Sequence, residues 1–544
     1  MGARHYSKDV GERRTLAFDG PLVPVAVATV CALLLEGLYL YSERPAVRVL
    51  LMCALGCVLV VGIVVIRALF GKNDDSHLFA HRVYPVLFVV LGLVVLFFSP
   101  PRTVPDEDYH YLKSYSYANL LVPGMGTTDM REEDRAFIET PDLYNRSYFN
   151  DYWGKVDGWS LFATHDGTVT IQPSEDEATR YGDFQVLDIG MDTPQTKIAS
   201  GLGIFLGRLL GLSGIAVFYL GRLFNFAFCA ALIILAVRLT PIGKSVFIAV
   251  SMLPMTLFLL ASYSYDAGVI GFSILLISLL LRMMHGTETI APRLMIASVV
   301  VAMLVAPGKL IYTLMALLCL FVPNARFSSR KQAVIWKFCM LCLPIVAVFA
   351  SRFAKIVSMS GINPSSQTGQ TRRGAGYYFT LSDAIADPGG MIQKYLRTIY
   401  LRGDFYLTSM LGGMPGWFEA GIEMPWWQVC IWVMVLAVSA MQSTDDGQIL
   451  RLRYRVGMAL VGIGGFALAV LSLLFAWSFV TDKVIEGVQG RYFLPFLPCV
   501  LFALRGKTLR FDAQAIPVLL VAICGLSCLN LMQLYYAAIG GVPL

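Results

Sequence analysis

Long apolar runs separated by short polar loops dominate this chain. A helical run of about 17 to 25 mostly apolar residues is long enough to cross the ~30 Å hydrocarbon layer of a membrane. The pattern predicts about thirteen spans, near 22–41, 47–66, 83–99, 214–237, 245–264, 266–282, 294–307, 309–323, 335–351, 425–441, 456–479, 491–505 and 514–537. We therefore expect an all-α polytopic membrane protein. Some of these runs, such as 309–323, are short for a straight crossing, and Pro307-Gly308 predicts a broken or partial span.

Two long segments interrupt the apolar pattern. The first, 100–198, is too long and too rich in Tyr and Trp to be a linker, so we expect it to carry some soluble structure against the membrane. The second, 352–424, contains a Gly/Ser/Gln-rich tract at 360–376 and then a stretch at 391–411 that predicts an amphipathic helix at the membrane interface.

The distribution of charge predicts the orientation. Lys and Arg gather in the loops on one side of a thirteen-span arrangement, and such clusters face the cytoplasm. Segment 100–198 lies on the other side and holds 18 of the 37 acidic residues but 8 of the 43 basic ones. We expect a cytoplasmic N-terminus, an extracytoplasmic first long loop and an extracytoplasmic C-terminus.

Composition supports a membrane class and excludes others. Hydrophobic residues make up 56% of the 544 and charged residues 15%, with a net charge of +6. No basic-aromatic stripe that would bind nucleic acid is visible. The eleven cysteines lie in or beside apolar runs and are interpreted as small hydrophobes, and no cleavable signal peptide precedes the first span. We divide the chain into a tail with a two-span hairpin (1–82), a core (83–505) and a C-terminal span (506–544).

The sharpest polar cluster is VPDEDYHYLK at 104–113, directly after the third predicted span. Asp106, Glu107 and Asp108 stand at the hydrocarbon boundary, where desolvation and like-charge crowding raise carboxyl pKa values and favour a general base. If a helix starts after Pro105, Asp106 and His110 share a face one turn apart, so that either Asp106 orients His110 or both hold an acceptor hydroxyl. The plainer alternative is that the acids merely solvate the start of a loop.

Other charges in or beside the apolar runs are candidates because burying a charge costs on the order of 3 kcal/mol. Lys309 follows the Pro-Gly break, Arg491 begins a span after Gly490, and Arg222 lies within the fourth span. These three cations suit a lipid phosphate. Asp266, at an outer turn, suits either helix capping or ligand binding. Glu36 in the first span is interpreted as a partner of Arg48. No metal-ligand spacing or nucleotide motif is present.

Several blocks of the sequence resemble a bacterial family of multispanning proteins defined as a domain of unknown function. They are PDEDYH, GRLLGLSGIAVFYLGRLFN, LPMTLFLLASYSYDAGV, GKLIYTLMALLCLFVPNARF and GVQGRYFLPFLP. That family is similar in layout to the GT-C membrane glycosyltransferases. The resemblance covers about 83–505, but the acidic motif here follows the third span instead of the first, which leaves 1–82 as an added hairpin.

The resemblance implies a GT-C-like glycosyltransferase of the bacterial cytoplasmic membrane. Asp106 or Glu107 would be the catalytic base, with His110 beside it, and Lys309, Arg491 and Arg222 would bind the phosphate of a polyprenyl-phosphate sugar donor. The acceptor would be a cell-envelope glycan or lipid, and no cofactor is implied, although acids near the outer face can recruit a divalent ion. Alternatives are a polymerase or ligase that uses lipid-diphosphate glycans, a flippase or other transporter of lipid-linked sugars, and a non-catalytic assembly subunit.

Overall fold

The computed structural model describes most of the membrane region. The described residues are 21–43, 47–70, 78–99, 101, 104–127, 129–138, 194–360, 379–413, 424–443, 450–506, 510–511 and 515–540. The predicted tract at 360–376 and most of the loop at 100–198 lie outside these ranges or at their edges, so the soluble structure expected there is described only for its two ends.

Eight helices among these residues are long and apolar enough to cross a membrane. They are α1 (Leu22–Glu43), α2 (Val47–Phe70), α4 (Tyr84–Phe98) with the π-helical turn η1 (Phe79–Val83) before it, α11 (Gly214–Leu239), α14 (Tyr265–Met284), α16 (Arg330–Ser360), α21 (Leu452–Ala476) and α23 (Ala515–Gly540). The chain is thus a multi-pass, helical membrane protein. The count of thirteen spans is not confirmed, because the remaining predicted spans are short or divided.

The other elements are shorter. They are α5 (Glu107–Asn119), α6 (Glu132–Ile138), α10 (Ile198–Leu209), α12 (Lys244–Ser251), α13 (Pro254–Leu260), α15 (Pro292–Val305), α18 (Leu381–Ala386), α19 (Pro388–Leu411), α20 (Trp426–Ala440) and α22 (Leu497–Leu504), and the 3-10 helices η2 (Pro194–Thr196), η3 (Leu310–Phe321), η4 (Asn324–Arg326) and η6 (Gly490–Phe493). Two-residue strands β1 (Gln442–Ser443) and β2 (Arg510–Phe511) pair in parallel.

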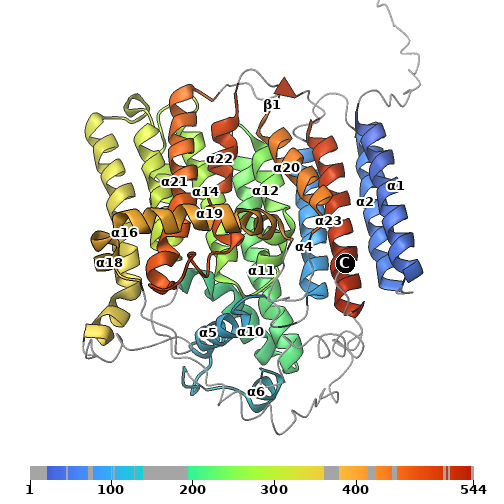
Figure 1. The fold of residues 1–544 in the computed structure, drawn as a ribbon, viewed down its shortest axis with the longest axis horizontal. Coiled ribbons are helices and arrows are strands. Elements are labelled where there is room, and N and C mark those ends of the chain that lie inside the picture. The colour runs from blue at the N-terminus through green and yellow to red at the C-terminus, as the bar shows by residue number, and fades with distance from the viewer. Residues whose placement is uncertain are drawn as a thin grey trace, which may run out of the picture.

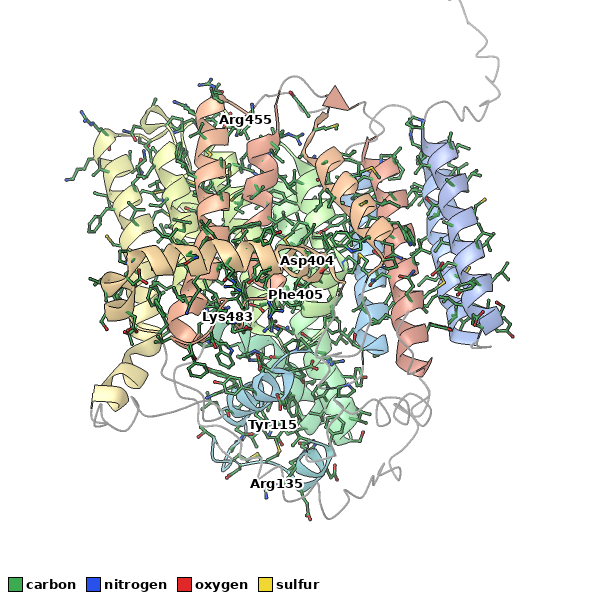
Figure 2. The ribbon with its side chains drawn as sticks, in the orientation of Figure 1. Tyr115, Arg135, Asp404, Phe405, Arg455 and Lys483 are labelled. Carbon is green, nitrogen blue, oxygen red and sulfur yellow. The ribbon has the colours of Figure 1, made fainter. Side chains whose placement is uncertain are left out.

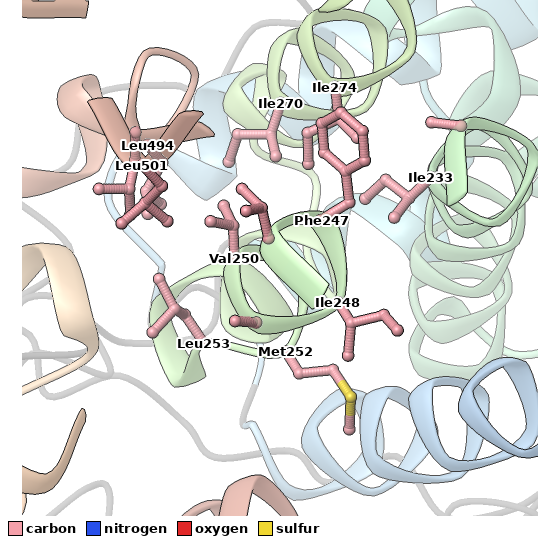
Figure 3. Packing of buried hydrophobic residues seen from close by; sticks show 14 of the residues in the cluster. Ile233, Phe247, Ile248, Val250, Met252, Leu253, Ile270, Ile274, Leu494 and Leu501 are labelled. Carbon is pink, nitrogen blue, oxygen red and sulfur yellow. The ribbon is translucent and has the colours of Figure 1, made fainter. Parts of the chain in front are cut away.

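The predicted span at 245–264 is divided into α12 and α13 by Pro254. Proline cannot donate the helical N–H bond, and Leu253 before it is extended, at φ −58° and ψ 138°. The hydroxyl of Thr256 donates to the carbonyl oxygen of Val250 at 2.8 Å, which satisfies an acceptor that the break leaves free. Figure 3 shows how Phe247 and its neighbours in α12 pack against Ile270 and Ile274 of α14. The break therefore lies inside the protein, where irregular backbone is tolerated.

Three helices cover one end of the bundle. Figure 1 shows α5, α6 and α10 at the lower end of the bundle, beside the end of α11, while α19 runs crosswise to the long helices. The helix expected at 391–411 is therefore present within α19. Gly203 and Gly207 allow α10 to approach α11, because a Cβ at Gly203 would meet the Leu220 carbonyl oxygen at 2.6 Å. Gly203 and Gly207 thus form a packing surface between α10 and α11.

Buried polar contacts fix α5 in this cap. The Tyr115 hydroxyl donates to Asp134 at 2.6 Å, and Arg131 binds the same carboxylate with two hydrogen bonds of 2.8 and 2.9 Å. The side chain of Arg208 in α10 donates to Asn119 at 2.7 Å. These contacts hold the C-terminal half of α5 within the cap.

The opposite ends of the bundle allow a test of the predicted topology. Arg455 lies at one end, whereas Tyr115 and Arg135 lie at the opposite end in the cap (Figure 2). In a background without reactive cysteines, we expect an impermeant maleimide to label Ser174→Cys in intact cells. Ser443→Cys at the Arg455 end should react only after permeabilisation. Equal labelling at the two positions would contradict the predicted orientation.

Candidate functional site

The residue directly before α5 has an unusual backbone conformation. Asp106, which directly precedes the helix, has φ 59° and ψ 22°, and it is the one non-glycine residue with positive φ among those described. A left-handed conformation is disfavoured for residues with a side chain, although Asp and Asn tolerate it best. Conformations of this kind are common at functional sites. Here it leaves the Asp106 side chain 57% exposed, whereas the side chain of the next residue, Glu107, is fully buried.

Glu107 forms a buried ion pair with Arg222 of α11. Arg222 Nη2 and Nε donate to the two carboxylate oxygens at 2.6 and 2.8 Å, and both side chains are completely buried. The Tyr263 N–H donates to Glu107 at 3.2 Å, and Arg222 Nη1 donates to the Ser99 carbonyl oxygen at 2.5 Å. These contacts occupy the fork of Arg222, so the geometry gives the pair a structural role and separates both residues from the exposed carboxylate of Asp106.

Arg491 connects two carboxylates from different helices. Its Nε lies 3.2 Å from Asp266 Oδ2, at the start of α14, and its Nη2 lies 3.7 Å from Asp106 Oδ2. The Arg491 and Asp266 side chains are 5% and 3% exposed. Arg491 thus forms a buried ion pair with Asp266 and a second, longer contact with the exposed carboxylate of Asp106.

Backbone contacts fix the position of Arg491. The Gly490 N–H donates to the Ser409 hydroxyl of α19 at 3.1 Å, and a Cβ at Gly490 would meet the Met410 backbone nitrogen at 2.3 Å. Glycine is therefore required for η6 to lie against α19. On the other side, the Ser264 side chain accepts from the Asp266 N–H at 3.2 Å and caps α14. The cap that the sequence allowed for Asp266 thus comes from Ser264, which leaves the Asp266 carboxylate to Arg491.

Lys309 enters the same cluster from the break between α15 and η3. Its backbone is extended, and its Nζ lies 2.9 Å from the centroid of the Tyr492 ring. Gly308 permits this path because a Cβ there would meet the Val269 side chain of α14 at 2.5 Å. The half-buried ammonium group interacts electrostatically with both Asp106 and Asp266. Lys309 and Arg491 are thus the two cations that interact with both Asp106 and Asp266.

Electrostatics distinguish the polar groups at the start of α5. Although more than half of the Asp106 side chain is exposed, partial desolvation by the surrounding protein raises the pKa of its carboxyl. The charges of Asp108 and Asp266 also raise this pKa, whereas Arg491 and Lys309 lower it. A raised pKa makes the carboxylate a better proton acceptor. Burial holds the pKa of His110 well below its ordinary value, and the nearby cations Lys197 and Arg491 lower it further. The His110 imidazole is therefore neutral, and its edge contacts the Tyr265 ring at a centroid distance of 5.3 Å.

Buried polar atoms without a hydrogen-bond partner gather here. Across the described residues, such atoms include His110 Nδ1, Asp266 Oδ1, the Tyr312 hydroxyl and Arg491 Nη1, whereas Asp266 Oδ2 and Arg491 Nε form the ion pair of 3.2 Å. Buried polar atoms in folded proteins are usually paired, so a cluster of unpaired donors and acceptors indicates a place for a polar ligand.

Some of these residues were not expected from the sequence. Tyr265, Tyr312 and Tyr492 surround Asp266 and Arg491 and interact with them electrostatically. Tyrosine is common in membrane helices, so the pattern alone did not mark them, although each adjoins or lies close to a charged residue that it did mark. The Lys197 side chain, fully buried, donates to the Tyr263 carbonyl oxygen at 2.9 Å.

Glu36 lies in a different part of the molecule. It accepts a hydrogen bond of 2.9 Å from Gln533 of α23, which in turn accepts one of 2.7 Å from Gln428 of α20. The expected pairing with Arg48 involves a side chain outside the described ones. Among the described residues, no group of three or more His, Cys, Asp or Glu side chains is arranged to hold a metal ion.

The comparison with protein families agrees with this organisation. A family model described as "Predicted membrane protein (DUF2142)" matches residues 88–500. The chain belongs to the DUF2142 family. The expected membership of a multispanning family of unknown function is confirmed. No curated protein and no solved structure matches the chain.

The DUF2142 match runs from α4 to α22. It contains all the elements that supply the site, from Asp106 to Arg491, and excludes α1, α2 and α23. Those three helices lie together at one side of the bundle in Figure 1, and α23 packs against both α1 and α2. The site is therefore built within the part of the chain that matches the DUF2142 family.

Proposed function

We propose that this protein is a GT-C-like membrane glycosyltransferase that uses a polyprenyl-phosphate sugar as donor. The observation that carries the proposal is the joint position of Asp106, Arg491 and Lys309. An exposed carboxylate with a raised pKa stands beside two cations at one end of a helical membrane bundle. A transfer from a lipid phosphate requires a general base next to groups that neutralise a departing phosphate.

The proposed reaction is a single displacement at the anomeric carbon. The Asp106 carboxylate takes the proton of an acceptor hydroxyl, and the hydroxyl oxygen forms a bond to the anomeric carbon as the bond to the phosphate oxygen breaks. The electron pair leaves with the lipid phosphate, whose charge Arg491 and Lys309 stabilise. Attack from the face opposite the phosphate inverts the configuration. His110, which is neutral and has an unpaired Nδ1, suits a hydrogen bond to a substrate hydroxyl.

Location and partners follow from the same proposal. The site would face the outside of a bacterial cytoplasmic membrane, with the N-terminus in the cytoplasm and the C-terminus outside, and thirteen crossings would satisfy this arrangement. The acceptor would be a cell-envelope glycan or a lipid. A flippase should place polar residues through the depth of several helices, whereas Asp266 and Arg491 lie beside Asp106, at the start of α5.

Donor binding should depend on the two cations. A charge-assisted hydrogen bond contributes about 1.5–3 kcal/mol, so Lys309→Ala or Arg491→Ala should weaken donor binding about tenfold to a hundredfold. Arg491→Lys should restore little, because an ammonium group cannot reproduce the planar guanidinium fork. Lys483→Ala, which removes an exposed cation from the loop before η6 (Figure 2), is the matched control. Unchanged affinity in both alanine variants would place the phosphate elsewhere.

Transfer itself can be tested with the purified full chain in lipid nanodiscs. A set of polyprenyl-phosphate sugars labelled in the sugar is incubated with extracted envelope lipids and glycans, and products are identified by mass spectrometry. We expect a new glycoside of inverted anomeric configuration with one of the donors. Movement of the labelled lipid across liposomes without any new glycoside would favour a flippase, and activity with lipid-diphosphate glycans alone would favour a polymerase or ligase.

A further inference from the structure

Arg491 is shared unequally by its two carboxylates. Asp266 is buried, lies 3.2 Å from Arg491 Nε and belongs to the capped first turn of α14. Asp106 is exposed, lies 3.7 Å from Nη2 and belongs to a left-handed residue before α5. The nearer contact joins two side chains that are almost completely buried, whereas the farther one reaches a carboxylate that water and substrate can approach. The two carboxylates therefore differ in their access to substrate, which suggests different roles for them.

The third nitrogen of the guanidinium group has no partner. Nη1 of Arg491 is buried and forms no hydrogen bond within the described structure. By contrast, Nε faces Asp266, and Nη2 lies 3.7 Å from Asp106 Oδ2 and 3.5 Å from the Tyr492 hydroxyl. A phosphate oxygen that binds Nη1 and Nη2 would displace Asp106 from Arg491 and leave Asp266 in place. Because the backbone of Gly490 is fixed against α19, the guanidinium group turns on its side chain alone.

From this geometry we infer that Asp266 is a positioning residue that holds Arg491 by its Nε edge, so that Asp106 is free to act as base when a phosphate diester binds. The inference rests on the proposed function. Without the Asp266 charge, Arg491 would turn to Asp106 as its remaining counter-ion, since a buried guanidinium group requires one. The Nη edge would then be occupied by the base itself.

The sign of the effect on Asp106 follows from the charges around it. Asp106 is faced by Asp108 of α5, Asp266 of α14, Lys309 before η3 and Arg491 of η6. Loss of Asp266 removes a negative charge that raises the pKa of Asp106 and strengthens the attraction to Arg491, which lowers it. Both effects have the same direction. The Asp106 carboxyl should therefore titrate at lower pH in Asp266→Asn than in the natural protein.

A binding experiment measures this titration without catalysis. The probe is the methyl ester of a polyprenyl phosphate, a diester that keeps one negative charge and does not titrate near neutral pH. Binding to the full chain in nanodiscs should tighten as the pH falls through the pKa of Asp106, because the protonated carboxyl releases Arg491. Asp106→Asn should abolish the part of this pH dependence that comes from the Asp106 carboxyl. Asp266→Asn should move its midpoint down by about one pH unit, the size expected for loss of a neighbouring like charge.

Further variants separate positioning from a loss of folding. Asp266→Glu keeps the charge and should bring the midpoint back toward that of the natural protein, and Asp266→Ser is a second neutral variant if the asparagine variant does not fold. Glu132→Gln, which removes an exposed carboxylate from α6, should leave the midpoint unchanged. A midpoint in the neutral variants equal to that of the natural protein would overturn the inference.

The outcomes also distinguish this inference from the proposed function. A shifted midpoint without sugar transfer from any donor would support the role of Asp266 and refute the glycosyltransferase. Transfer that depends on Asp106, combined with an unshifted midpoint, would support the glycosyltransferase and refute the role of Asp266. Failure of the natural protein to bind the diester at any pH would refute both.

Discussion

Replacing Asp106 with Asn should reduce sugar transfer about 100-fold to 10,000-fold, the usual contribution of a positioned general base. The substitution keeps the size of the side chain and removes its ability to accept a proton. Asparagine also tolerates the left-handed conformation at φ 59°, so the start of α5 should stay intact. Donor binding should be kept or tightened, because Arg491 and Lys309 are unchanged and the neutral side chain no longer pairs with Arg491. Initial rates with the labelled donor, and donor affinity measured separately, test this expectation.

Asp108 supplies the matched control for this prediction. It lies two residues farther along, is half-buried, and accepts a hydrogen bond from the Tyr109 N–H at 2.8 Å. Its charge contributes to the raised pKa of Asp106, so Asp108→Asn should have a milder effect than Asp106→Asn. Near-normal transfer by Asp106→Asn would contradict this prediction and would favour the plainer interpretation, in which the acidic residues 106–108 only solvate the start of a loop.

Replacing Glu107 with Gln should damage the fold more than the chemistry. The Glu107–Arg222 pair is fully buried, and removing one partner of such a pair costs about 3–5 kcal/mol because the other charge is left unpaired. Arg222→Met should be destabilising for the same reason. Thermal unfolding in detergent and the yield of monodisperse protein measure this effect.

The double variant makes the interpretation specific. Glu107→Gln combined with Arg222→Met removes both charges, so it should be less destabilised than the sum of the two single variants, with a coupling of about 0.5–3 kcal/mol. If Glu107 were the base instead, Glu107→Gln would be as stable as the natural protein and inactive. That result would contradict the assignment of roles within the acidic run.

The sequence predicted the membrane class well because long apolar helices have a strong signal. It was less successful where a helix is interrupted inside the protein. At 245–264 the composition is uniformly apolar, and only Pro254 records that the helix divides, with Thr256 compensating the break. At Pro307-Gly308 the interruption was expected, but not the 3-10 geometry of η3, which packs mainly against α16 and against α21, an element far away in the chain.

The sequence predicted the individual charged residues of the candidate site but not which of them form ion pairs with one another. Charges in apolar surroundings marked Glu107, Arg222, Asp266 and Arg491, since each must be compensated. Their partners are far apart in the chain, and no local spacing shows that Glu107 pairs with Arg222 while Arg491 pairs with Asp266. The pattern therefore placed Arg222 with the phosphate-binding cations, whereas the structure places it in the buried pair.

A structure of the protein with a bound polyprenyl-phosphate sugar tests the central claim most directly. We predict density for the phosphate between Lys309 and Arg491, with the anomeric carbon facing the Asp106 carboxylate, Asp266 still on the Nε edge of Arg491, and Glu107 still paired with Arg222. Density for the lipid phosphate at any other position, with the Arg491–Asp106 contact unchanged, would contradict the proposed function.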